Sequence, residues 1–368
     1  PAYGYVVVAQ EVAAFQAEFG FAPFGPFAGQ LSNGGETLVL RNVAGQMVDE
    51  VDYDAGFPWP IVGTAPAQSV ESLNPALDNN QGPHWRPSLA SGPTPGALNS
   101  VYAASFAPFL YDVDHSPNSP VPGEAVAVTA LVADADGVAS VQLRYQLVDP
   151  GGYIALTDPA YATDWTSLAM LDDGLGADAV AGDGIYSAEL PAALQTHRRL
   201  VRYRVTATDA LANATTGPFA EDPQPNFAYF VYGATPPWQG AIEPGSADPD
   251  KAAVVAYDGI VLDSLPTYQL ITKAADVQDA QWLQSYSGDD YPWLATLVYG
   301  GNVYDHVRYR AGGDAWRYAM GKNAWELDFN RAHGFQADDN YGDNYSESWD
   351  TLTLSSVLQR GDLGARGE

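Results

Sequence analysis

Residues 125–148 read AVAVTALVADADGVASVQLRYQLV, two β-forming runs on either side of an Asp-Ala-Asp-Gly turn. Similar runs return at residues 184–190 and 200–209, and Asp, Gly, Pro or Asn bound each of them. Apolar and β-branched residues at period two indicate strands with a buried face. Several short strands at this spacing, separated by such turns, predict a β-sandwich.

The middle of the chain, residues 101–232, also resembles a known family. The stretches VTALVADADGVASVQLRYQ, MLDDGLGADAVAGDGIYSAELP and VRYRVTATDALAN resemble the bacterial Ig-like domain that often stands directly before a CotH-type kinase domain. The resemblance implies an Ig-like β-sandwich over residues 101–232.

Residues 1–100 carry another mixture of β and turn signals. We expect a strand at residues 4–10, a short helix at 11–19, and a hairpin of residues 36–41 and 46–53 with one buried face. The chain is then rich in Pro, Gly and Asn down to SGPTPGALNS, the composition of a linker.

The order of motifs in these first hundred residues resembles the lamin-tail domain of bacterial secreted proteins. The resemblance rests on LSNGGETLVLRNVAGQMVDEVDYD, SVESLNPALDNNQGPHWRPS and GPTPGALNS. It implies a compact Ig-like sandwich whose two N-terminal strands are missing from this sequence. Together with residues 101–232 it predicts tandem Ig-like β-sandwiches.

Residues 233–261 have the Pro, Gly and acidic composition of a linker, and the character of the chain changes after them. In residues 262–368 we expect a strand feeding a short helix, a hairpin turning at Gly300-Gly301, and another strand in KNAWELDFN. This order resembles the N-terminal portion of the CotH kinase family and implies a smaller α+β segment. Both ends of the sequence thus fall inside domains, which leads us to expect a longer polypeptide or strands supplied by a neighbouring subunit.

The charge of the chain excludes some classes of partner. Its formal net charge is −29, whereas nucleic acids and anionic lipids are bound through Lys and Arg. We therefore expect no nucleic acid partner, and the lack of a long apolar run predicts no membrane insertion. The absence of cysteine excludes disulfides, thiolate metal sites and thiol catalysis.

The acidic residues are mostly Asp in turns, which points to solvated loops or to Ca²⁺ sites made of hard oxygen ligands. The first candidate site is a Gly-rich loop. Asp172, Asp173, Asp178 and Asp183 lie in it. A second candidate combines two turns that can meet at one end of a sandwich, with Asp134, Asp136, Asp209 and Asn213. A third candidate, Asp339 with Asp343, lies in an acidic stretch that a solvated loop explains equally well.

Some residues would contact ATP if the kinase resemblance extends to function. The resemblance places Lys322 at the ATP-contacting lysine and Arg308 and Arg310 on the phosphate side, but the catalytic acids belong to a half that this sequence lacks. The alternative for Lys322 is an ordinary solvent-facing residue. The five histidines show no zinc-site spacing, and no P-loop or nucleophile elbow is present.

Three functions are compatible with these observations. The first is a secreted or cell-surface structural protein, stabilised by Ca²⁺, that associates with copies of itself or with another surface protein in a filament or layer. The second is the non-catalytic and N-lobe part of a secreted CotH-type kinase. The third is a module that binds surface polysaccharide, for which the abundant aromatic residues are the argument.

Overall fold

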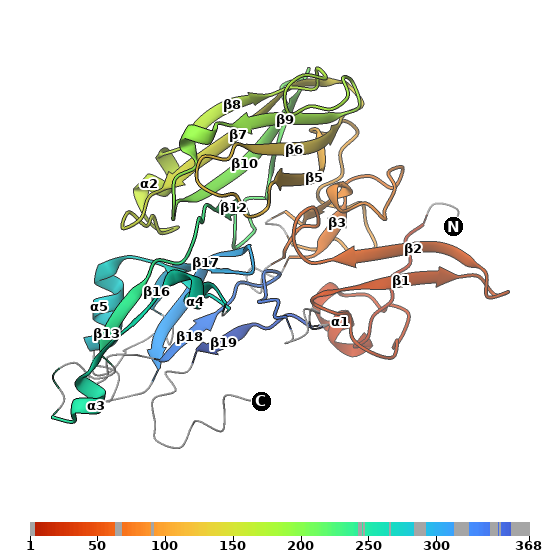
Figure 1. Cartoon of the computed structure of the whole chain (residues 1–368). Coiled ribbons are helices and arrows are strands. Elements are labelled where there is room, and N and C mark those ends of the chain that lie inside the picture. The colour runs from red at the N-terminus through yellow and green to blue at the C-terminus, as the bar shows by residue number, and fades with distance from the viewer. Residues whose placement is uncertain are drawn as a thin grey trace.

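The computed structural model describes residues 4–62, 68–89, 92–241, 245, 247–264, 266–282, 292–312, 324–338, 345 and 347–354. These residues form a mainly β protein with several antiparallel sheets and few short helices (Figure 1). The expected mainly β class is confirmed. No helix in this part of the chain is both long and apolar enough to cross a bilayer.

Two antiparallel sheets in the middle of the chain share one core. One has the order β5-β6-β9, and the other has the order β11-β10-β7-β8 with β12 also paired to β10. The strands are β5 (Phe109–Ser116), β6 (Val126–Ala133), β7 (Val138–Val148), β8 (Thr166–Met170), β9 (Ile185–Leu190), β10 (Leu200–Asp209), β11 (Ala214–Gly217) and β12 (Phe227–Phe230). The connections contain the short helices α2 (Pro159–Thr163) and η2 (Ala192–Leu194).

The pattern of the sequence explains this core. In β6, Val126 and Val128 are fully buried, and they pack in the same cluster as Leu143 of β7 and Val205 of β10. Burying each such side chain stabilises the fold by roughly 1.5–3 kcal/mol. The expected strands at 138–148 and 200–209 match β7 and β10, and those at 125–133 and 184–190 begin one residue before β6 and β9.

The first hundred residues form smaller units. Helix α1 (Val12–Phe19) matches the expected helix and ends at Gly20, which has φ +80°. The expected strand at 4–10 was wrong, since only an isolated bridge joins Val8 to Phe24. The strands are β1 (Gly35–Arg41) paired with β2 (Met47–Asp54), and β3 (Val70–Ser72) paired with β4 (Trp85–Pro87); η1 (Gly82–His84) precedes β4. Among the described residues these are separate two-stranded sheets, and the expected first sandwich stays a prediction.

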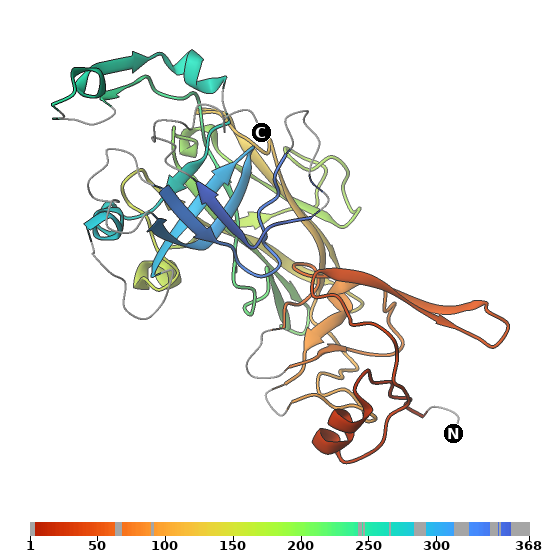
Figure 2. The ribbon, with the colours of Figure 1, turned by 90° about the horizontal axis from the view of Figure 1, so that it is seen from below.

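The β1–β2 hairpin forms as expected, but its expected buried face does not. Neither strand contains a buried residue, and Leu40 and Val48 are each about 60% exposed. Figures 1 and 2 show the hairpin extending away from the rest of the molecule. The two strands thus form and pair as expected, but none of their residues is buried by the rest of the described chain.

Part of the Pro- and Gly-rich stretch before residue 100 is fixed by one buried carboxylate. Glu71 accepts hydrogen bonds from the N–H groups of Thr94 and Ser100 (3.1 and 2.7 Å) and from their hydroxyls (2.8 and 2.6 Å). Burial alone raises a carboxyl pKa, but these four hydrogen bonds bring the pKa of Glu71 below its ordinary value. The stretch therefore packs against β3, although its composition is that of a linker.

The last part of the chain forms a five-stranded antiparallel sheet. Its order is β15-β16-β17-β18-β19, and its core includes Leu297, Tyr309 and Leu327. The elements are β15 (Gln269–Ile271), α5 (Ala274–Trp282), β16 (Trp293–Tyr299), β17 (Asn302–Gly312), β18 (Ala324–Asp328) and β19 (Thr351–Leu354). The expected hairpin at Gly300-Gly301 joins β16 to β17, and both glycines have positive φ.

The stretch expected as a linker, residues 233–261, contains regular structure. Strand β13 (Trp238–Ala241) pairs with β14 (Val254–Tyr257), and the short helices α3 (Pro249–Ala252) and α4 (Gly259–Asp263) lie beside this pair in the chain. Most of its described residues are exposed. The stretch is therefore a small exposed hairpin between the two larger sheet systems.

Candidate functional site

Two groups of aspartates lie at one end of the two packed sheets. The β6–β7 turn, the end of β10 and the β8–β9 loop meet there, because the pairings of β6 with β9 and of β7 with β8 and β10 align these strand ends. We call Asp172, Asp178 and Asp183 of the β8–β9 loop the loop cluster. We call Asp134, Asp136 and Asp209 the turn cluster. In each cluster, one carboxylate oxygen per residue lies within 4.8 Å of the other two.

The spacing in both clusters fits a calcium ion. Oxygens that share one Ca²⁺ bind at roughly 2.3–2.6 Å, so they lie at most about 5 Å apart. In the loop cluster, Asp178 Oδ1 accepts one hydrogen bond, from the N–H of Val180 at 3.2 Å, and its Oδ2 accepts one from Gly174. Each oxygen keeps a lone pair for a metal. Glycines in the same loop let backbone carbonyls approach as further ligands.

The turn cluster joins the two sheets. Asp134 and Asp136 lie in the connection from β6 to β7, and Asp209 ends β10. Asp209 is buried, and its Oδ1 accepts the N–H groups of Leu211 (2.8 Å) and Asn213 (2.7 Å). Burial alone raises its pKa, but the hydrogen bonds from Asn213 and Leu211 lower the pKa of Asp209 below its usual value.

Like charges in each cluster are not balanced by basic side chains. Within the described residues, none of the six carboxylates forms an ion pair with Lys or Arg. Two unit charges about 4 Å apart repel by roughly 1–4 kcal/mol near a protein surface. Both clusters can therefore hold a metal ion, and a cation there would remove this repulsion.

Two residues predicted with these clusters have other roles in the structure. Asp173 is not among the three grouped loop residues, and its Oδ1 accepts the N–H of Leu175 at 3.0 Å. Asn213 donates its side-chain N–H to Asp209 Oδ2 at 2.7 Å. Asp173 is thus a turn residue by this geometry, and Asn213 orients a carboxylate of the turn cluster.

The candidate ATP contacts lie in the C-terminal sheet. Arg308 Nε donates to Asp328 at 2.9 Å, and Arg310 Nε donates to Glu326 at 2.8 Å. Both acids lie on the neighbouring strand β18, so cross-strand ion pairs engage both guanidinium groups. Lys322, Asp339 and Asp343 lie outside the described residues.

A buried polar network that the sequence did not reveal joins the middle sheets to the C-terminal sheet. Arg202 of β10 and Asp305 of β17 are fully buried and form a two-point ion pair of 2.7 and 2.9 Å. Asp305 also accepts from Thr296 (2.5 Å) and from the side chain of Asn226 (2.9 Å). Burial alone raises its pKa, but the charge of Arg202 holds the pKa of Asp305 well below its usual range.

His306 completes this network in a strained conformation. It is buried with φ +56°, a region that costs a non-glycine residue about 1–3 kcal/mol. Asn226 Nδ2 donates to Asp305, so Asn226 Oδ1 is an acceptor and the His306 Nε2–H donates to it at 2.8 Å. Its Nδ1 has no hydrogen-bond partner. The only sequence signal was the polar pair in the apolar run VYDHV, which fits an exposed turn equally well.

Comparison with known proteins assigns no family. No family model and no curated protein matches the chain. Among solved structures, trypsin-activated alpha-2-macroglobulin from Escherichia coli matches with 12% sequence identity and a TM-score of 0.17, over 88% of this chain and 26% of that one. The chain spans about a quarter of that protein, and so low a TM-score supports no argument about fold or function.

Proposed function

We propose that this chain is a secreted or cell-surface structural protein whose β modules bind Ca²⁺ and associate with copies of themselves or with another surface protein. The observation that carries the proposal is the meeting of two aspartate clusters at one end of the packed sheets. Extracellular calcium modules bind Ca²⁺ with a Kd of about 10⁻⁴–10⁻³ M. A loop that supplies only a few protein ligands is sufficient for an affinity in this range.

An ion in the turn cluster would act as a clamp between elements. Asp134 and Asp136 follow a strand of one sheet, and Asp209 ends a strand of the other. Ser105, on the segment that arrives from the first hundred residues, donates its hydroxyl to Asp136 at 3.2 Å. Calcium would therefore fix the two sheets and the incoming segment at one point.

Calcium is expected to raise the thermal midpoint of this protein. A site that is filled to about ten to one hundred times its Kd stabilises the native state by roughly 1.4–2.7 kcal/mol. The measurement is a thermal melt in 10 mM CaCl₂ against a melt in EDTA, with MgCl₂ as the ion control. Equal midpoints in calcium and EDTA would refute the calcium part of the proposal.

Two variants of the same loop separate binding from loop folding. Asp178→Asn removes a charge of the loop cluster and is expected to abolish that site's share of the calcium shift. Asp173→Asn removes a charge from the same loop outside the cluster and should leave the shift intact. If both variants lose the shift equally, calcium acts on the loop's general charge and not at the cluster.

The β1–β2 hairpin is the part of the surface that best suits self-association. Its exposed apolar residues are Leu38, Val39, Leu40, Val43, Met47 and Val48. Long exposed edge strands with apolar side chains are ready templates for pairing with another chain. Calcium would assist by lowering the repulsion between molecules of net charge −29.

Replacing Leu40 and Val48 together by lysine is expected to weaken self-association at least tenfold. Each change removes an exposed apolar contact and adds a charge at the edge. Light scattering over a concentration series measures the effect. Ile260→Lys, in the exposed helix α4, is the matched control and should change nothing. A wild-type chain that stays monomeric at all concentrations, with and without calcium, would contradict the self-association part.

The finer architecture belongs to the same proposal. The resemblances support a lamin-tail-like unit at 1–100, an Ig-like unit at 101–232, a connecting stretch at 233–261 and a CotH-like portion at 262–368. The kinase alternative stays a prediction, because Lys322 lies outside the described residues and Arg308 and Arg310 are paired with Asp328 and Glu326. Polysaccharide binding also stays a prediction.

A further inference from the structure

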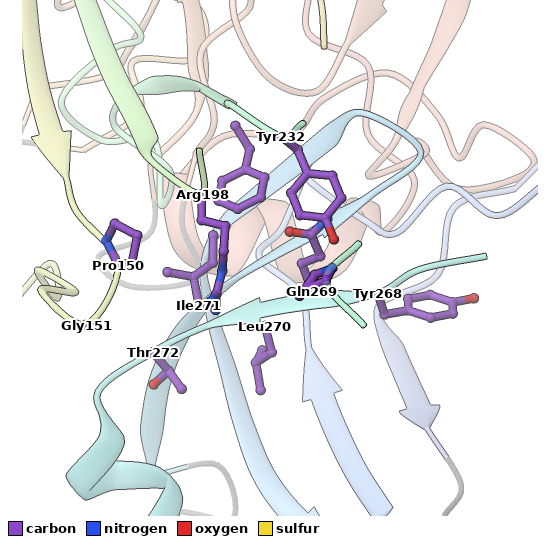
Figure 3. Close-up of a pocket in the computed structure, with 11 residues that line it drawn as sticks. Pro150, Gly151, Arg198, Tyr232, Tyr268, Gln269, Leu270, Ile271 and Thr272 are labelled. Carbon is purple, nitrogen blue, oxygen red and sulfur yellow. The ribbon is translucent and has the colours of Figure 1, made fainter. Parts of the chain in front are cut away.

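A pocket lies at the junction of the middle sheets and the C-terminal sheet, away from the aspartate clusters. Its volume is about 340 Å³, within the size range of small-ligand sites. One wall comes from the end of the middle unit, with Arg198, Phe230 and Tyr232. The other wall is the continuous run of residues 268–272, which includes β15 (Figure 3).

The β15 wall presents a sheet edge to the pocket. β15 is the terminal strand of its sheet and pairs only with β16 among the described residues. Five consecutive residues line the pocket here, as expected when the edge of a strand borders a cavity. The side chains of Gln269 and Ile271 lie on the side of Arg198 and Tyr232, whereas Leu270 and Thr272 point the other way (Figure 3). Unpaired N–H and C=O groups at such an edge can accept an additional extended strand.

Arg198 supplies a positive charge at this edge. Its side chain extends toward β15 (Figure 3), and no hydrogen bond or ion pair of its guanidinium is found within the described residues. Asp149, which directly precedes the lining residues Pro150 and Gly151, is already paired with Arg199 at 2.7 Å. Arg198 also has φ +65°, a conformation that costs a residue other than glycine about 1–3 kcal/mol. Arg198 is exposed, so its guanidinium is accessible and can bind a carboxylate in a two-point contact.

We propose that this pocket binds the C-terminal end of an extended peptide. The peptide backbone pairs with the open edge of β15, and its terminal carboxylate binds the guanidinium of Arg198. The last side chain packs on the apolar part of the lining, which Phe230 and Ile271 supply. The side chain of Gln269 also lines the pocket and can hydrogen-bond to the peptide. This site goes beyond the calcium-binding function proposed above and does not depend on it.

The matched probes are two acetylated pentapeptides of the sequence Ser-Thr-Val-Tyr-Val, one with a free C-terminal carboxylate and the other with a C-terminal amide. Isothermal titration calorimetry of each against the full chain, in EDTA, measures binding without any calcium effect. A charge-assisted hydrogen bond contributes about 1.5–3 kcal/mol, so the carboxylate peptide should bind roughly 10- to 100-fold more tightly than the amide.

Arg198→Asn is the variant that isolates the charge. Asparagine tolerates positive φ better than most residues, so the backbone turn is retained while the guanidinium is lost. It should reduce binding of the carboxylate peptide to the level of the amide, and a melting midpoint equal to that of the wild type would verify folding. Arg41→Asn, in the distant β1–β2 hairpin, is the control and should bind as the wild type does.

Several outcomes would overturn the proposal. Equal affinities of the two peptides for the wild-type chain would remove the role of the carboxylate. Absence of binding at millimolar peptide would show that the pocket is not a peptide-binding site. Binding of glucuronate that depends on Arg198, without peptide binding, would reassign the pocket to acidic saccharides. The comparison of the two peptides uses only the wild-type chain, so it decides the question even if Arg198→Asn fails to fold.

Discussion

Replacing Asp305 by alanine is expected to lower the free energy of unfolding by about 3–5 kcal/mol. The change leaves the guanidinium of Arg202 fully buried without its carboxylate partner, and Thr296 and Asn226 lose their acceptor. An unpaired buried charge is far more costly than a lost surface ion pair. Urea denaturation followed by tryptophan fluorescence measures the loss.

Two comparisons sharpen this test. Asp149→Ala breaks the ion pair with Arg199, in which Asp149 is 63% exposed, and should cost no more than about 1 kcal/mol. The double variant Arg202→Met with Asp305→Leu removes both charges and should recover much of the loss. An Asp305→Ala variant as stable as Asp149→Ala would show that the two sheet systems do not depend on this network.

The second large effect is a loss of folding stability at acid pH, which we expect from His306. Burial lowers the pKa of His306 from 6.5 to about 4; the neighbouring Asp305 opposes this shift, and Arg202, Arg204 and His333 add to it. The folded protein therefore holds His306 neutral, whereas the unfolded chain takes up a proton near pH 6.5. The contribution of His306 to the free energy of unfolding is fully present above pH 6.5 and falls as the pH drops to about 4. The loss amounts to about 3 kcal/mol.

The reason for this loss is visible in the network. A proton would enter at Nδ1, which is buried and has no acceptor. Urea denaturation at pH 7, 5.5 and 4 measures how the free energy of unfolding changes with pH. His306→Asn cannot titrate and tolerates the positive φ, so its stability should fall less over this range. Burial also lowers the pKa of His115, which leaves a residual slope in the variant.

An unchanged wild-type stability between pH 7 and pH 4 would contradict this prediction. The pH range from 7 to 4 also separates the contribution of His306 to acid sensitivity from that of Asp305. The pKa of that carboxyl is depressed, so its contribution is lost only below about pH 4. Acid sensitivity above about pH 5 thus reports on the histidines, because Glu71, whose pKa is also lowered, begins to lose its contribution only below that pH.

The candidate calcium residues were predictable because turn chemistry is local. The sequence placed Asp172, Asp178 and Asp183 in one loop, and a glycine-rich loop of this length folds back on itself. The turn cluster was predicted from the expectation that two sandwich turns lie at one end, and Asp134, Asp136 and Asp209 do meet. Asp173 could not be separated from its neighbours, because the direction of a side chain in a turn depends on the final backbone.

The sequence alone determined the strands of the middle sheets, because period-two burial is a local property of one strand and its neighbours. It also determined the acidic turns. Only the tertiary structure decided which strands gained a covering layer: β6 did, whereas the β1–β2 hairpin stayed largely exposed. The tertiary structure likewise decided that Arg202 and Asp305, 103 residues apart, would form one buried pair. A contact between distant strands depends on how whole sheets pack, which no local pattern encodes.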